Sequence, residues 1–193
     1  MIYFDNAATT IIHPDAINAM VEIMNKNYGN PSSVHSAGRS AKAKVESSIK
    51  YIANSLGVLP REIIFTSGGT EGDNMVLQSA VNHLGIKHII SSPIEHHAVL
   101  YPLQYMADQG IIQLHMVKVL RTGLPDIEDL KRLLEIVKDR KLVSLMHVNN
   151  EVGTKIDLNL IGSLCHQHNA LFHSDTVQSV SYTHLTLPTR LSV

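Results

Sequence analysis

The sequence predicts an α/β protein built in three layers, with a mostly parallel sheet and helices on both of its faces. Short β-rich runs alternate with helical segments along most of the chain. Repeated β-α-β units with connections of this length form parallel sheets. Residues 142–148 are also nearly continuously apolar, which is typical of a strand that is covered on both faces.

Apolar residues recur with helical spacing in several segments. In the first of them, Pro14 occupies the permitted first turn, and Ile17, Val21 and Met24 fall on one face. The second segment ends at Gly57, a residue that often terminates helices. The predicted helices begin at Pro14 and near residue 41, and then cover about 70–84, 96–107, 125–137 and 158–168. The strand-like runs are 62–66, 89–91, 111–119 and 142–148, and the last helix leads into 170–173.

Composition excludes several classes of protein. Of the 193 residues 44% are hydrophobic and 17% are charged, and the net charge is -1, so a nucleic-acid partner is not expected. No apolar run reaches the roughly 18 residues that a membrane helix needs, and no leader peptide is expected at the N-terminus. The single cysteine, Cys165, excludes an internal disulfide framework and fits a reducing cytoplasm.

One break in composition appears after Val180. Residues 1–180 contain no internal repeat or linker, whereas residues 181–193 show neither helical nor strand periodicity and are rich in hydroxyl side chains. We therefore expect the segment from Ser181 onward not to continue the sheet, and interpret it as an artefact of cloning or assembly.

The turn before the predicted helix at residue 70 favours a phosphate ligand. Gly68 and Gly69 follow a strand-like run and open the helix, so that its first N–H groups are accessible to an anion. Thr70 adds a hydroxyl donor. The turn lacks the Lys-Ser/Thr of a nucleotide P-loop and the spacing of a dinucleotide fingerprint. An ordinary glycine-rich turn with Thr70 as the helix cap would give the same pattern.

Three polar positions follow other strand-like runs. His96, Asn150 and Asp175 would lie at the carboxyl edge of the sheet, where open α/β sheets bind ligands. Asp175 would need a partner there, and a protonated heterocyclic nitrogen could supply one. Each residue also has a structural interpretation. His96 and Asp175 could cap helices, and Asn149 and Asn150 could form a turn.

Two other chemistries are disfavoured. Cys165 and His168 share a helix face, but no second cluster with zinc-type spacing exists, so we expect no metal. A serine hydrolase is disfavoured because the Gly-x-Ser-x-Gly elbow is missing.

Taken in order, the motifs make the segment 2–180 resemble the cysteine desulfurases, which are fold-type I pyridoxal-phosphate enzymes of the class V aminotransferase group. The motifs are Asp5-Asn6-Ala7-Ala8, Gly29-Asn30-Pro31, Ser67-Gly68-Gly69-Thr70, Glu95-His96, His147-Val148-Asn149-Asn150-Glu151 and Asp175-Thr176-Val177-Gln178. The resemblance implies that residues 1–180 are a short N-terminal segment plus an incomplete large domain of a pyridoxal-phosphate-dependent transferase.

The resemblance also implies roles for individual residues. Gly69 and Thr70 would hold the cofactor phosphate, and His96, the one catalytic residue expected here, would stack on the pyridine ring and assist proton transfer. Asp175 would pair with the ring nitrogen and so make the ring an electron sink. Gln178 would bond the ring hydroxyl, and Asn150 would lie near the substrate carboxylate.

The implied reaction converts L-cysteine into alanine and an enzyme persulfide. The implied partners are a second copy of the enzyme, in a homodimer, and a sulfur acceptor or iron–sulfur scaffold protein. The family's Ser-x-His-Lys motif, whose lysine binds the cofactor, is missing from these 193 residues, and Cys165 is not expected to be the nucleophilic cysteine. We therefore expect this chain alone to be inactive. A selenocysteine lyase, another class V enzyme and a short non-enzymatic binding protein for a phosphorylated ligand or a partner remain as alternatives.

Overall fold

The structure is a computed structural model that describes residues 2–180. The chain divides into two compact units, Met1–Phe65 and a second unit that begins at Thr66. Among the described residues, no helix is long and apolar enough to cross a lipid bilayer.

The first unit contains the two helices that the sequence predicts. Helix α1 spans Pro14–Lys26 and helix α2 spans Ser36–Leu56. Gly57 ends α2 in the left-handed conformation, with φ 67°, which glycine adopts without steric cost. The apolar face of α1 is not covered within this unit, since none of its residues is buried.

The strand predicted over 62–66 is wrong. A 3-10 turn, η1, occupies Pro60–Glu62, and the residues after it join no strand of the described chain. Ile64 and Phe65 are 68% and 53% exposed. Their β-branched and aromatic character favours a strand, but a strand also needs a neighbouring strand to bond, and the described part of the first unit contains none.

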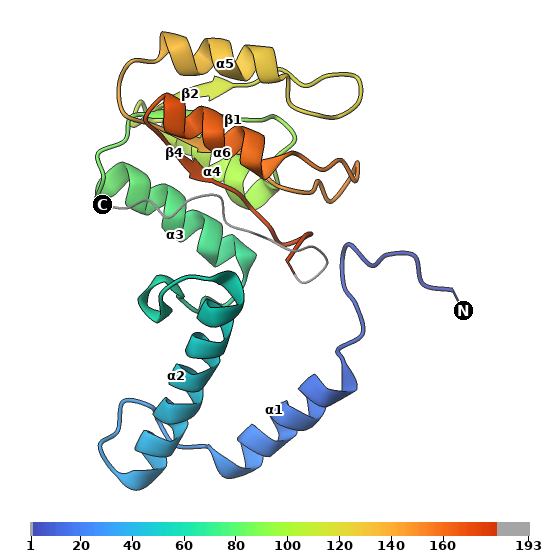
Figure 1. Cartoon of the computed structure of the whole chain (residues 1–193), viewed down its shortest axis with the longest axis vertical. Helices are drawn as coiled ribbons and strands as arrows, with labels where there is room; N and C mark the ends of the chain where they lie inside the picture. The colour runs from blue at the N-terminus through green and yellow to red at the C-terminus, as the bar shows by residue number, and fades with distance from the viewer. Residues whose placement is uncertain (1, 181–193) are drawn as a thin grey trace. The chain divides into compact units, whose positions relative to one another are not determined.

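The second unit contains a four-stranded parallel sheet, which confirms the predicted fold class (Figure 1). Its strand order is β2-β1-β3-β4. The strands are β1 His88–Ser91, β2 Gln113–Met116, β3 Lys141–Ser144 and β4 Ala170–His173. Each strand except the last leads into a helix that returns the chain to the same edge of the sheet, as parallel pairing requires.

Helices cover both faces of this sheet. The helices are α3 Gly69–Asn82, α4 His97–Asp108, α5 Ile127–Ile136 and α6 Leu158–Gln167. Neighbouring strand residues point to opposite faces, so that Ile89 packs with the core formed by α3 and α4, while Ile90 packs with the core formed by α5 and α6. The three-layer prediction is therefore confirmed.

Two strands are shorter than their apolar patterns predict, and β3 shows why. The predicted strand 142–148 ends as a regular ladder at Ser144. The chain beyond it stays buried and still bonds to the segment after β4, because Leu145 N donates to His173 O and His147 N donates to Asp175 O. The buried, apolar segment is thus longer than the hydrogen-bonded strand β3. It continues into the carboxyl edge of the sheet, where the candidate site residues follow the strands. The other shortened strand, β2, occupies only 113–116 of the predicted 111–119.

Candidate functional site

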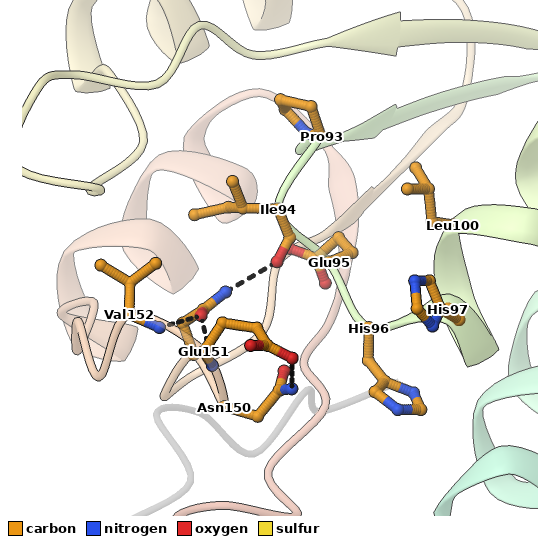
Figure 2. Close-up of a pocket in the computed structure, with 10 residues that line it drawn as sticks. Pro93, Ile94, Glu95, His96, His97, Leu100, Asn150, Glu151 and Val152 are labelled. Atoms are coloured by element: carbon orange, nitrogen blue, oxygen red, sulfur yellow. Dashed lines mark hydrogen bonds between the residues drawn. The ribbon is translucent and has the colours of Figure 1, made fainter.

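The order of the strands places a crevice between the carboxyl ends of β1 and β3. From β1 the chain moves to β2 on one side, and from β3 it moves to β4 on the other. Loops that diverge in this way leave a gap in which α/β proteins bind ligands. A cavity of about 270 Å³ lies here (Figure 2). It is lined by Pro93, Ile94, Glu95, His96, His97, Leu100, Asn149, Asn150, Glu151 and Val152.

His96 caps helix α4 at the edge of this cavity. Its Nδ1 accepts a hydrogen bond from Ala98 N at 3.1 Å, so the structural role considered for this residue is confirmed. A neutral ring that accepts at Nδ1 carries its proton on Nε2. Nε2 and the faces of this exposed ring are therefore the parts that a ligand could contact, and Nε2–H is a donor.

The loop after β3 is organised by Asn149, which the sequence analysis considered only as part of a possible turn. The Asn149 side chain is buried; its Nδ2 donates to Ile94 O at 2.7 Å, and its Oδ1 accepts from the backbone N–H groups of Glu151 and Val152. Asn149 thus forms the turn and ties the β3 loop to the β1 loop. Asn150 lines the cavity, and its Nδ2 donates to Glu151 Oε1 at 3.1 Å (Figure 2).

Glu95 is a buried carboxyl group beneath the same cavity. It is 6% exposed, and both of its oxygens lie within hydrogen-bond distance of Met146 N. Burial raises the pKa of Glu95 to about 8, and the nearby charges of Asp175 and Asp73 act in the same direction, against the Met146 hydrogen bond. At neutral pH this carboxyl group is therefore mainly protonated.

A second hollow, of about 490 Å³, lies at the N-terminus of α3. It is lined by Gly69, Gly72, Asp73, Ser174, Asp175, Thr176, Val177 and Val180. The cap residue Gly68 has no side chain to accept the first N–H groups of the helix, and the positive end of the helix dipole adds to their attraction for an anion. A Cβ atom at Gly69 would lie 2.7 Å from Val177 Cγ2, so that glycine also allows the close packing of this turn.

Asp175 is the buried acid of this second hollow. It is 7% exposed, and its Oδ1 accepts a hydrogen bond from Val177 N at 2.9 Å. Burial raises the pKa of Asp175, and the charge of Asp73 raises it further, whereas the Val177 hydrogen bond, His96 and His173 lower it. A carboxylate in this position gains from a cationic partner.

The sequence-predicted residues are divided between the two hollows. Gly69 and Asp175 line the hollow at the N-terminus of α3, whereas His96 and Asn150 line the cavity between the carboxyl ends of β1 and β3. Thr70 lies exposed in the first turn of α3, and Gln178 lies half-buried three residues after Asp175. His96 lowers the pKa of Asp175, so a residue that lines one hollow affects the acid of the other.

Four buried or half-buried polar residues at this edge were given no role by the sequence reasoning: Asp73, Glu95, Ser144 and His173. For Ser144 and His173 the available signal was a polar residue inside, or at the end of, an apolar run. Cys165, in contrast, is buried in α6, and burial raises the pKa of its thiol to about 12. No group of three or more His, Cys, Asp or Glu residues within 2–180 is arranged to hold a metal ion.

The comparisons with known proteins agree with this architecture. The sequence pattern of the aminotransferase class-V family matches residues 2–189, and the chain belongs to that family. A cysteine desulfurase IscS of Dictyoglomus turgidum is 39% identical over 94% of this chain and 46% of its own length, and a mitosomal cysteine desulfurase of Trachipleistophora hominis is 41% identical over 92% and 41%.

Solved structures give the same result. A NifS-like protein superposes with a TM-score of 0.91 at 34% identity, over 97% of this chain and 52% of its own. A structure described as SspA in complex with cysteine superposes with a TM-score of 0.87 at 27% identity, over 95% and 53%. The chain thus spans about half the length of the proteins it matches.

Proposed function

We propose that this chain forms the N-terminal half of a pyridoxal-phosphate-dependent cysteine desulfurase. The observation that supports this most is the hollow in which the uncapped N-terminus of α3 and the buried carboxyl group of Asp175 lie together. An anion site beside a buried acid fits a ligand with a phosphate at one end and a basic ring nitrogen at the other. Below, "the longer protein" means this chain continued through the C-terminal half that its relatives have.

The phosphate end is assigned to the first turn of α3. The backbone of Gly69 and the hydroxyl of Thr70 would donate to phosphate oxygens, since helix N-termini bind anions with their free N–H groups. Glu71 lies in the same turn, and its Oε2 accepts a hydrogen bond from Ser67 N at 2.5 Å. That bond lowers the pKa of Glu71.

The ring end is assigned to Asp175 and its neighbours. An ionised Asp175 would accept from the protonated ring nitrogen, and Gln178, three residues further on, would bond the ring hydroxyl. His96 would lie against the ring and offer the proton on Nε2, while the amide of Asn150 would bind on the substrate side. The cofactor, when bound, supplies an electron sink that allows bonds at the substrate carbon to break.

L-cysteine is the proposed substrate, and alanine and an enzyme persulfide are the proposed products. The cysteine desulfurase names of the relatives and the cysteine complex of SspA support this choice. A homodimer in the cytoplasm, with a sulfur acceptor or iron–sulfur scaffold protein as partner, is proposed from the family resemblance.

The phosphate assignment is tested by Thr70→Val, which removes the hydroxyl group and keeps the shape of the side chain. We expect the affinity of the longer protein for pyridoxal phosphate to fall about tenfold or more, the usual loss for a hydrogen bond to a charged group. Equilibrium dialysis against pyridoxal, which lacks the phosphate, is the control and should give the same affinity for variant and wild type. Unchanged affinity for pyridoxal phosphate would remove Thr70 from the site.

A further inference from the structure

Three polar side chains, those of Asp73, His173 and Ser144, contact one another in a row beside the proposed cofactor site. The imidazole of His173, on β4, lies between Asp73 of α3 and Ser144 of β3. Its Nε2 is 3.4 Å from Asp73 Oδ1, and its Nδ1 is 2.9 Å from Ser144 Oγ. The side chains of His173 and Asp73 are only 12% and 8% exposed, and Ser144 is fully buried.

This arrangement fixes the ring of His173 and gives it a charged neighbour. A buried carboxylate such as Asp73 is costly unless a cation or a donor faces it, and His173 Nε2 is placed to serve as that donor. Ser144 Oγ can accept from Nδ1 or donate to it, so the imidazole keeps a partner whether it carries one proton or two.

This row of three side chains lies next to Asp175. His173 and Asp175 are two residues apart where β4 ends, which puts both side chains on one side of the extended backbone. Asp73 lines the same hollow as Asp175. The titratable groups facing Asp175 are therefore Asp73 and His173, together with His96 and Glu95 from the β1 loop, and Asp73 raises the pKa of Asp175 whereas His173 lowers it.

We propose that His173 is a positioning residue that keeps Asp175 ionised, because its imidazolium neutralises Asp73 and prevents two unpaired carboxylates from sharing one buried region. The inference rests on the proposed function, since it takes Asp175 to be the partner of the ring nitrogen. Without His173, Asp73 and Asp175 would compete to stay charged, and a proton would be taken up between them.

The test compares two cofactors that differ at one ring atom. In the 1-deaza analogue of pyridoxal phosphate a C–H group replaces the ring nitrogen, so this analogue cannot use the charge of Asp175. We expect His173→Gln to lower the preference of the longer protein for pyridoxal phosphate over the analogue, measured as a ratio of Kd values, by about tenfold, which equals one pKa unit. A residue that only supports the fold would weaken both ligands equally, and that result would overturn the proposal.

A double variant keeps the test decisive if the single one folds poorly. In Asp73→Asn/His173→Gln the competing carboxylate is gone, so we expect the ratio to return most of the way to that of the wild type. A ratio as low as in His173→Gln, or lower, would overturn the proposal. A wild-type protein that binds both cofactors equally would instead contradict the role given to Asp175, and a wild type that binds neither would contradict the proposed function itself.

Discussion

Asp175→Asn is expected to lower the turnover of L-cysteine by the longer protein by about one to two orders of magnitude. The variant loses the charge-assisted hydrogen bond to the ring nitrogen, a loss on the order of 1.5–3 kcal/mol, and with it the interaction that keeps the ring protonated. The fold should persist, because the asparagine oxygen can still accept from Val177 N as the Asp175 Oδ1 does at 2.9 Å.

Asp157→Asn is a matched control for this prediction. Asp157 caps helix α6, and its Oδ1 accepts from the backbone N–H two residues ahead, that of Asn159, at 2.9 Å. The two aspartates therefore have the same local backbone contact, and only Asp175 lies in the hollow. Equal turnover in wild type and Asp175→Asn, or equal losses in both variants, would show that Asp175 is a structural cap.

Glu95→Gln is expected to change how stability depends on pH. The pKa of Glu95 is raised from 4.5 to about 8 in the folded protein, so the folded state holds a proton that the unfolded state releases. Its contribution to stability is fully present below pH 4.5, falls as the pH rises, and is lost by about pH 8. The neutral glutamine still offers an oxygen to Met146 N. We expect it to stabilise the protein by roughly 4 kcal/mol at pH 8 and by little near pH 4.5.

Urea unfolding of the cofactor-free protein across this pH range measures the effect. The raised pKa of Asp175 has the same sign, so the variant should flatten the pH dependence without abolishing it. Glu135→Gln, at an exposed position of α5, is the control and should follow the wild-type curve. A wild-type stability that rises between pH 4.5 and 8, or a Glu95→Gln curve parallel to it, would contradict the assignment.

Much of the fold could be predicted because it depends on local patterns. Periodic apolar residues and terminal glycines located the helices, and the β-α-β order gave the parallel sheet. The strand predicted over 62–66 failed because strand formation also requires a partner, and Ile64 carries no information about which backbone, if any, lies beside it. Apolar character likewise overestimated the length of β3, since burial continues beyond Ser144 where the ladder ends.

The candidate site was predicted in part for a similar reason. His96, Asn150 and Asp175 follow strands, and the carboxyl edge of a parallel sheet brings such residues to one side. The pairing of Asp73 with His173 joins residues that are far apart in the chain, and no spacing rule connects them. The raised pKa of Glu95 depends on its burial and on the nearby charges of Asp175 and Asp73, which only the packed structure reveals. Whether His96 acts as a helix cap also required the structure, which shows the bond to Ala98 N.

The products formed from L-cysteine show whether the longer protein is a cysteine desulfurase. The longer protein, loaded with pyridoxal phosphate, is incubated with L-cysteine and a reductant, and alanine and sulfide are measured together, with L-selenocysteine in a parallel reaction. We expect alanine and sulfide in equal amounts, and turnover of L-cysteine whether or not L-selenocysteine also reacts. Turnover of L-selenocysteine alone, a keto acid in place of alanine, or no reaction in a protein that has bound its cofactor would contradict this function.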